Sequence, residues 1–96
     1  MLMAMEIQQE NDDKNGLFFI EQEGKKVAKM IYTWAGDDRI IIEHTEVDDA
    51  LKGKGAGKEL VAKSVEFARE KGIKIVPVCS FAKSIFDKVT DYQDVL

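Results

Sequence analysis

The chain has 96 residues and a formal net charge of −4, with 45% hydrophobic and 33% charged residues. This length and balance exclude a disordered chain and favour one soluble globular domain over residues 1–96. The negative charge argues against general nucleic-acid binding, which normally requires a net basic surface.

Four strands are predicted in the first half of the chain, because β-branched and aromatic residues alternate there with polar ones. The expected strands are a short one around Ile7 and three longer ones over residues 17–21, 27–34 and 39–47. Polar or glycine-containing turns are expected at 11–16, 23–25 and 35–38. A meander of this kind favours an antiparallel sheet. In the third strand, Val27, Lys29, Ile31 and Thr33 should share one face.

After residue 57 the apolar spacing changes to that of a helix. Apolar and small residues at positions 60, 61, 64, 65 and 68 form one stripe of a helix predicted over 57–71. Gly72 follows as its stop. A short apolar strand over 73–78 comes next, and this strand–helix–strand order favours parallel pairing with the strand at 40–47. The pattern therefore predicts a mixed α/β protein of the α+β type.

A last helix is predicted from Ser80, acting as its cap, to about Lys88.

A glycine-rich turn, Lys52-Gly53-Lys54-Gly55-Ala56-Gly57-Lys58, precedes the central helix. Phosphate binding needs unpaired backbone N–H groups that point at one spot, and a helix N-terminus supplies them. Glycine allows positive φ and close approach, while lysines add charge without a fixed geometry. The spacing excludes a Walker A loop and the dinucleotide fingerprint. The turn alone is equally compatible with a solvated structural connection.

From Val47 to Leu60 the sequence resembles motif A of the Gcn5-related N-acetyltransferases, Arg/Gln-x-x-Gly-x-Gly/Ala between a fourth strand and a central helix. Lys52 stands where Arg or Gln is usual, while Gly55 and Gly57 match. The order of elements also resembles that fold, without its usual helices between strands one and two. The chain also resembles a minimal, single-domain branch of that family, in the segments His44-Thr45-Glu46-Val47 and Val76-Pro77-Val78-Cys79 and in Phe81 and Tyr92.

The resemblance implies that acetyl-coenzyme A (acetyl-CoA) is the co-substrate and that an unidentified amine accepts the acetyl group. The residues assigned to cofactor binding are Glu46, Val47, Lys52, Gly53, Lys54, Gly55, Ala56, Gly57 and Lys58. The resemblance further implies that the strands at 40–47 and 73–78 splay apart, with His44 and Cys79 near the thioester end of the bound cofactor. Backbone N–H groups near Glu46 and Val47 would hold an oxyanion.

His44 and Cys79 are the candidate catalytic residues. Histidine suits proton transfer near neutrality, and a cysteine just before a helix can have a lowered pKa and act as nucleophile or acid–base partner. Each also has a structural interpretation. His44 shares strand parity with Ile40 and Ile42 and would then lie hydrogen-bonded at the core edge, and Cys79 would be a small buried hydrophobe.

Larger relatives usually place a tyrosine in the last helix as general acid, but Ile85 and Phe86 occupy this one. Tyr92 lies beyond its expected end. Glu43 and Glu46 are further candidates for a base, although glutamates on a strand edge are usually solvated.

Three functions therefore stay open: an N-acetyltransferase, a CoA-binding regulatory module without efficient catalysis, and a small protein-interaction domain with a structural glycine turn.

Cys79 is the only cysteine, which excludes an intramolecular disulfide and favours a reducing compartment. With one histidine and no Cys/His cluster, no metal site is expected. Residues 1–5 are apolar but lack a basic leader and are too short for a signal or membrane segment. The sequence thus predicts a cytoplasmic protein without a membrane partner.

Overall fold

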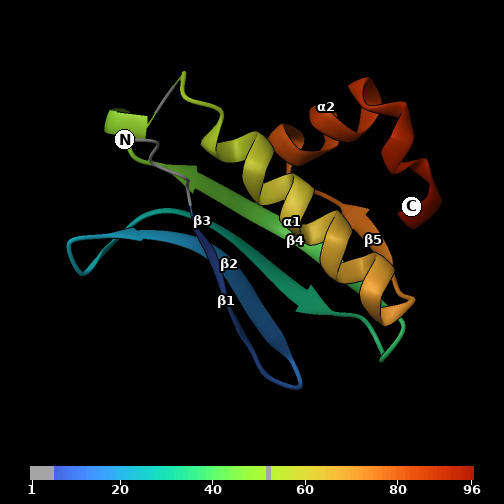
Figure 1. Cartoon of the computed structure of the whole chain (residues 1–96). Coiled ribbons are helices and arrows are strands. Elements are labelled where there is room, and N and C mark those ends of the chain that lie inside the picture. Colours follow the sequence, from blue (N-terminus) through green and yellow to red (C-terminus); the bar gives the residue numbers. More distant parts are fainter. Residues whose placement is uncertain (1–5, 52) are drawn as a thin grey trace.

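A computed structural model describes residues 6–51 and 53–96, and it contains a five-stranded sheet with helices packed against it (Figure 1). The strands are β1 Ile7–Asn11, β2 Asn15–Gln22, β3 Lys25–Trp34, β4 Arg39–Val47 and β5 Lys74–Pro77. The α-helices are α1 Ala56–Lys71 and α2 Ser80–Lys88, and the 3-10 helices are η1 Asp49–Leu51 and η2 Thr90–Val95. The sheet order is β1-β2-β3-β4-β5.

The pairing confirms the predicted α+β class. Neighbouring strands from β1 to β4 are antiparallel, and β4 and β5 are parallel. This parallel pairing starts at Arg39 opposite Lys74 and ends at Ile42 opposite Pro77, whereas β4 itself continues to Val47. The Ile42 carbonyl accepts the last two bonds, from the N–H groups of Val78 and Cys79, both at 3.0 Å. The far half of β4 is therefore open on its β5 side.

Helix α1 crosses one face of the sheet (Figure 1). The helical stripe predicted from the sequence forms its buried side, in which Leu60, Val61 and Ala68 are fully buried. The sheet contributes an equally apolar surface, including Phe18, Met30, Tyr32, Ile40, Ile42 and Ile75. Burial of this area is the main force that holds the helix on the sheet.

The prediction that Val27 shares one face of its strand with Lys29, Ile31 and Thr33 is wrong for Val27. Ala28, Met30 and Tyr32 share the face of β3 that is buried in the core. Lys29, Ile31 and Thr33 lie half-buried on the other face. Val27 does not share that face, because it packs in the core cluster next to Ala28. The cause is a bulge: β2 residues Ile20 and Glu21 oppose Ala28 and Lys26, which leaves Val27 as an extra residue.

Two element boundaries also differ from those expected. Ser80 is the first residue of α2 rather than its cap, and Cys79 occupies the cap position in an extended conformation. Cys79 is held there by its N–H bond to Ile42. The turn expected at 11–16 is shorter, since Asn11 ends β1 and Asn15 begins β2. Asp12 makes this possible, because its Oδ1 accepts the N–H groups of Lys14 and Asn15 at 2.8 and 2.9 Å.

Over the described residues, the model has no helix that is both long and apolar enough to span a membrane.

Candidate functional site

The N-terminus of α1 follows a glycine turn and has no side-chain cap from the described residues. Gly53 and Gly55 both adopt the left-handed conformation, with φ of 80° and 79°, and Gly55 is the N-cap with no side-chain capping bond. The first bond inside the helix runs from the N–H of Glu59 to the Gly55 carbonyl, at 3.0 Å. Helix geometry therefore leaves the N–H groups of Ala56, Gly57 and Lys58 without a partner inside the helix. Such an end attracts anions.

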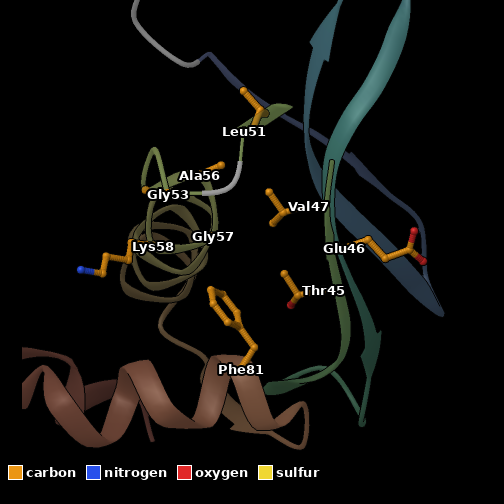
Figure 2. Close-up of a pocket in the computed structure, with 10 residues that line it drawn as sticks. Thr45, Glu46, Val47, Leu51, Gly53, Ala56, Gly57, Lys58 and Phe81 are labelled. Carbon is orange, nitrogen blue, oxygen red and sulfur yellow. The ribbon is translucent and has the colours of Figure 1, made fainter. Parts of the chain in front are cut away.

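This helix end faces the open half of β4 across a cleft of about 700 Å³. Figure 2 shows the glycine turn on one side, the strand on the other and Phe81 of α2 below. The side chains of Thr45 and Val47 point into the cleft, and that of Glu46 points away from it. The lining residues are Thr45, Glu46, Val47, Leu51, Gly53, Gly55, Ala56, Gly57, Lys58 and Phe81.

Cys79 lies beside the cleft rather than in its lining. Its Sγ donates a hydrogen bond to Oγ1 of Thr45 at 3.5 Å, and the side chain is half-buried against the core. Burial acts to raise the pKa of this thiol. A hydrogen bond from the Ala82 backbone to the thiolate acts the other way, as does the Thr45 hydroxyl when it turns to donate to the thiolate, and the net pKa is lowered. The position of Cys79 at the start of α2 also favours a thiolate, because a helix N-terminus stabilises negative charge.

His44 lies on the opposite side of β4 from the cleft. Its Nε2 is 2.8 Å from Oε2 of Glu46, whose side chain points away from the cleft (Figure 2). Both side chains are more than half exposed, at 58% and 56%. The expected parity of His44 with Ile40 and Ile42 is wrong, because a bulge in β4 changes the register.

The bulge is visible in the pairing with β3. Ile31 opposes His44 and Tyr32 opposes Ile42, so Glu43 is an extra residue. Beyond Glu43 the alternation is reversed relative to Ile40 and Ile42. The reversal sends His44 outward and brings Thr45 and Val47 to the cleft.

Three comparisons agree with this architecture. A family model described as GCN5-related N-acetyl-transferase matches residues 17–95. The chain belongs to the GCN5-related N-acetyltransferase family. It is 31% identical over 74 residues to Protein NATD1 of Xenopus tropicalis, a match that covers 76% of this chain and 68% of that protein.

Solved structures of N-acetyltransferase type share the fold. A GCN5-like protein from Staphylococcus aureus, determined by NMR, is 38% identical, with a TM-score of 0.74 over 98% of this chain and 89% of that one. The aminoglycoside N-acetyltransferase AAC(6')-Iy, solved in complex with CoA, has a TM-score of 0.64 at 12% identity and shows the same fold. That match covers 86% of this chain and 88% of the aminoglycoside enzyme.

Most of the predicted cofactor residues lie around one cleft in the structure. The structure brings Glu46, Val47, Gly53, Gly55, Ala56, Gly57 and Lys58 around one cleft. Lys54 is exposed and does not line it, and Lys52 lies outside the described residues. Cofactor binding by any of them stays a prediction.

Three lining residues were not predicted as site residues. Thr45 could have been found, because it has the same strand parity as Val47. Leu51 enters through the short turn η1, which has no recognisable signal in the sequence. Whether the Phe81 side chain reaches the cleft depends on where α2 begins.

Two further candidates lie away from the cleft. Tyr92 packs its ring on Phe86, with centroids 5.9 Å apart, and lines a separate groove between α1 and α2. Glu43 is exposed at the bulge. The described structure therefore brings neither of them into the cleft lining.

Proposed function

We propose that this protein binds acetyl-CoA in the cleft and transfers the acetyl group to an amine. The observation that carries this proposal is the uncapped N-terminus of α1, which faces the open half of β4. The N–H groups that have no partner inside the helix suit the pyrophosphate, and Lys58 and Lys54 add positive charge close by. The strand side suits a linear pantetheine arm, because an open strand edge offers backbone hydrogen bonds along its length.

The family and the fold support the choice of ligand. Proteins of this family are N-acetyltransferases, and one structure with the same fold was solved with CoA. The single-domain organisation over 1–96 and a cytoplasmic location stay predictions.

For the chemistry, the amine nitrogen forms a bond to the carbonyl carbon and the bond from that carbon to the CoA sulfur breaks. Two protons must move: one leaves the amine and one reaches the CoA thiolate. Cys79, whose thiol is hydrogen-bonded to Thr45 of the cleft wall, would protonate the thiolate. The His44–Glu46 pair lies on the other side of β4, and His44 would accept the proton of an amine that approaches from that side.

Titration with acetyl-CoA tests the binding step, with Gly55→Asp as the disruptive variant. We expect the variant to lose binding, because a carboxylate would stand where the pyrophosphate sits. Gly24→Asp is a matched control, since Gly24 has a similar φ of 77° and open space around it but lies in the β2–β3 turn. Equal affinity of both variants would refute the placement of the pyrophosphate.

Transfer itself is tested with isotope-labelled acetyl-CoA and a panel of primary amines. We expect Cys79→Ala and His44→Ala to slow product formation about 10²-fold or more, the usual contribution of acid–base groups. Unchanged rates in both variants would remove these residues from the reaction.

The alternative is a CoA-binding module without efficient transfer, and one observation favours it. Within the described lining, the titratable side chains are Glu46 and Lys58, and Figure 2 shows both pointing away from the centre of the cleft. Acetyl-CoA binding with no acetylated amine in any reaction would select this function.

A further inference from the structure

Phe81 occupies the space beside the phosphate-binding turn. It lies in the first turn of α2, and its side chain reaches up towards Gly57 (Figure 2). A Cβ added to Gly57 would lie 2.2 Å from Cζ and 2.5 Å from Cε2 of the Phe81 ring. A side chain at residue 57 would therefore push the ring out of this position.

The same ring separates two cavities. It lines the cleft of about 700 Å³ and also a groove of about 320 Å³ between α1 and α2. Of the other residues, only Lys58 lines both. Ile85 of α2 and Val89 and Tyr92 just beyond it give the groove an apolar part beside Ser84 and Lys88, and this part offers a ring a favourable second position.

Phe81 also lies near the thiol. Cys79 precedes Phe81 by two residues and contacts Thr45. Of these three residues, Thr45 and Phe81 line the cleft and Cys79 does not. The ring is 41% exposed, so it is not locked by packing on all sides. Rotation about χ1 in a partly exposed side chain is a fast, low-barrier motion.

We propose that Phe81 is a gate that closes the cleft towards Cys79 and opens by rotating into the groove between α1 and α2. With the ring against Gly57, Phe81 is part of the cleft wall and Cys79 lies outside the cleft lining. With the ring in the groove, a molecule in the cleft reaches Sγ. The gate rests on the proposed function only in that an acyl-CoA thioester is the molecule it admits.

Alkylation of Cys79 tests the gate directly, since this is the only cysteine and modification therefore reports one site. The probes are iodoacetamide and the larger N-ethylmaleimide. Rates are compared on the plateau at high pH, so that a changed thiol pKa does not contribute. Phe81→Ala should react about tenfold faster than the wild type, with the larger gain for N-ethylmaleimide. Phe81→Trp should react more slowly than the wild type.

Val78→Ala is the matched control. Val78 is 62% exposed and adjacent to Cys79, but it lines neither cavity. Its alkylation rate should equal that of the wild type. Phe81→Leu provides a second opening variant if Phe81→Ala does not fold. Equal rates for the Phe81 variants and Val78→Ala would overturn the gate.

Acetyl-CoA titrations of the same variants separate the two proposals. If the wild type fails to bind acetyl-CoA while Phe81→Ala still accelerates alkylation, the gate stands and the proposed ligand is wrong. If acetyl-CoA binds and Phe81→Ala leaves alkylation unchanged, the gate is wrong and the proposed ligand stands.

Discussion

The two ends of α1 are bounded by glycines in the same conformation but have opposite surroundings. Gly72 at the C-terminus has φ of 67° and Gly55 at the N-terminus has φ of 79°. The Gly72 N–H closes the helix by donating to the Ala68 carbonyl, and Arg69 in the last turn binds Asp94 through two hydrogen bonds at 2.7 and 3.0 Å. At Gly55 no side chain of the described residues caps the helix, and the helix end lines the cleft.

Packing differs between the two halves of the helix in the same way. Near its C-terminal half, the Phe67 ring meets Phe18, Tyr32 and Trp34, with centroids 5.7, 6.2 and 6.1 Å away. Near its N-terminus, the helix faces the cleft and the partly exposed ring of Phe81. A glycine that stops a helix and a glycine that opens a binding site are therefore distinguished by what surrounds them, not by their backbone angles.

The largest effect is expected where the helix is closed. Phe67→Ala should lower the free energy of unfolding by about 3–5 kcal/mol, because it removes a buried ring from an aromatic cluster. Phe81→Ala, at the open end, should cost less than about 1 kcal/mol, since its ring is partly exposed. Urea unfolding followed by circular dichroism measures both. Similar losses would show that the open end is packed as tightly as the closed end.

The two glycines themselves give the matched pair. Gly55→Ala and Gly72→Ala should each cost about 1–2 kcal/mol of stability, because alanine is strained at positive φ and neither site has a neighbour within 4 Å of an added Cβ. Only Gly55→Ala should also weaken acetyl-CoA binding in a calorimetric titration. Equal affinity in the two variants would mean that the open helix end holds no part of the ligand.

At the cleft wall, Thr45→Val should raise the pKa of Cys79, because the Thr45 hydroxyl can turn to donate a hydrogen bond to the thiolate and valine cannot. The pH at which the iodoacetamide rate reaches half its plateau reports this pKa. It should move upward in Thr45→Val and stay unchanged in Thr33→Val, a half-buried threonine of β3. A shift in the control as large as that in Thr45→Val would show that the contact is not responsible.

The smallest effect concerns the clamp at the closed end. The hydrogen bond from Arg69 lowers the pKa of Asp94 below its ordinary value. A carboxyl whose pKa is depressed by folding stabilises the fold above its unfolded pKa of about 4, and this contribution is lost as the pH falls through the folded pKa. Asp94→Asn should therefore lose less stability than the wild type between about pH 6 and pH 2. An identical loss, measured by thermal unfolding, would contradict the role of the clamp.

Much of this fold could be predicted from local patterns. The stop at Gly72 and the buried stripe of α1 follow from helical spacing, and the predicted span of β4 is the one observed. The bulge at Glu43 could not be predicted, because it is a property of the pairing between β4 and β3 rather than of β4 alone. Its consequence was large, since it reversed the side on which His44 lies.

The candidate site was partly predictable for the same reason. The glycine turn is a local motif, so its location at the start of α1 could be predicted from the sequence. The contact between Phe81 and Gly57 joins two elements that are distant in sequence, and it depends on the exact packing of α2. Cys79 as the helix cap likewise depends on its bond to Ile42 across the sheet.

The most direct test of the central claim is an acetyl-CoA titration of ¹⁵N-labelled protein followed by NMR, at ligand concentrations up to about 1 mM. We expect saturable shifts in the amides of Gly55, Ala56, Gly57 and Lys58 and in those of β4 from Thr45 to Val47. The Gly72 amide at the other end of α1 should stay in place. No shift at the Gly55 end, or equal shifts at both ends, would contradict the claim that this helix N-terminus binds the cofactor.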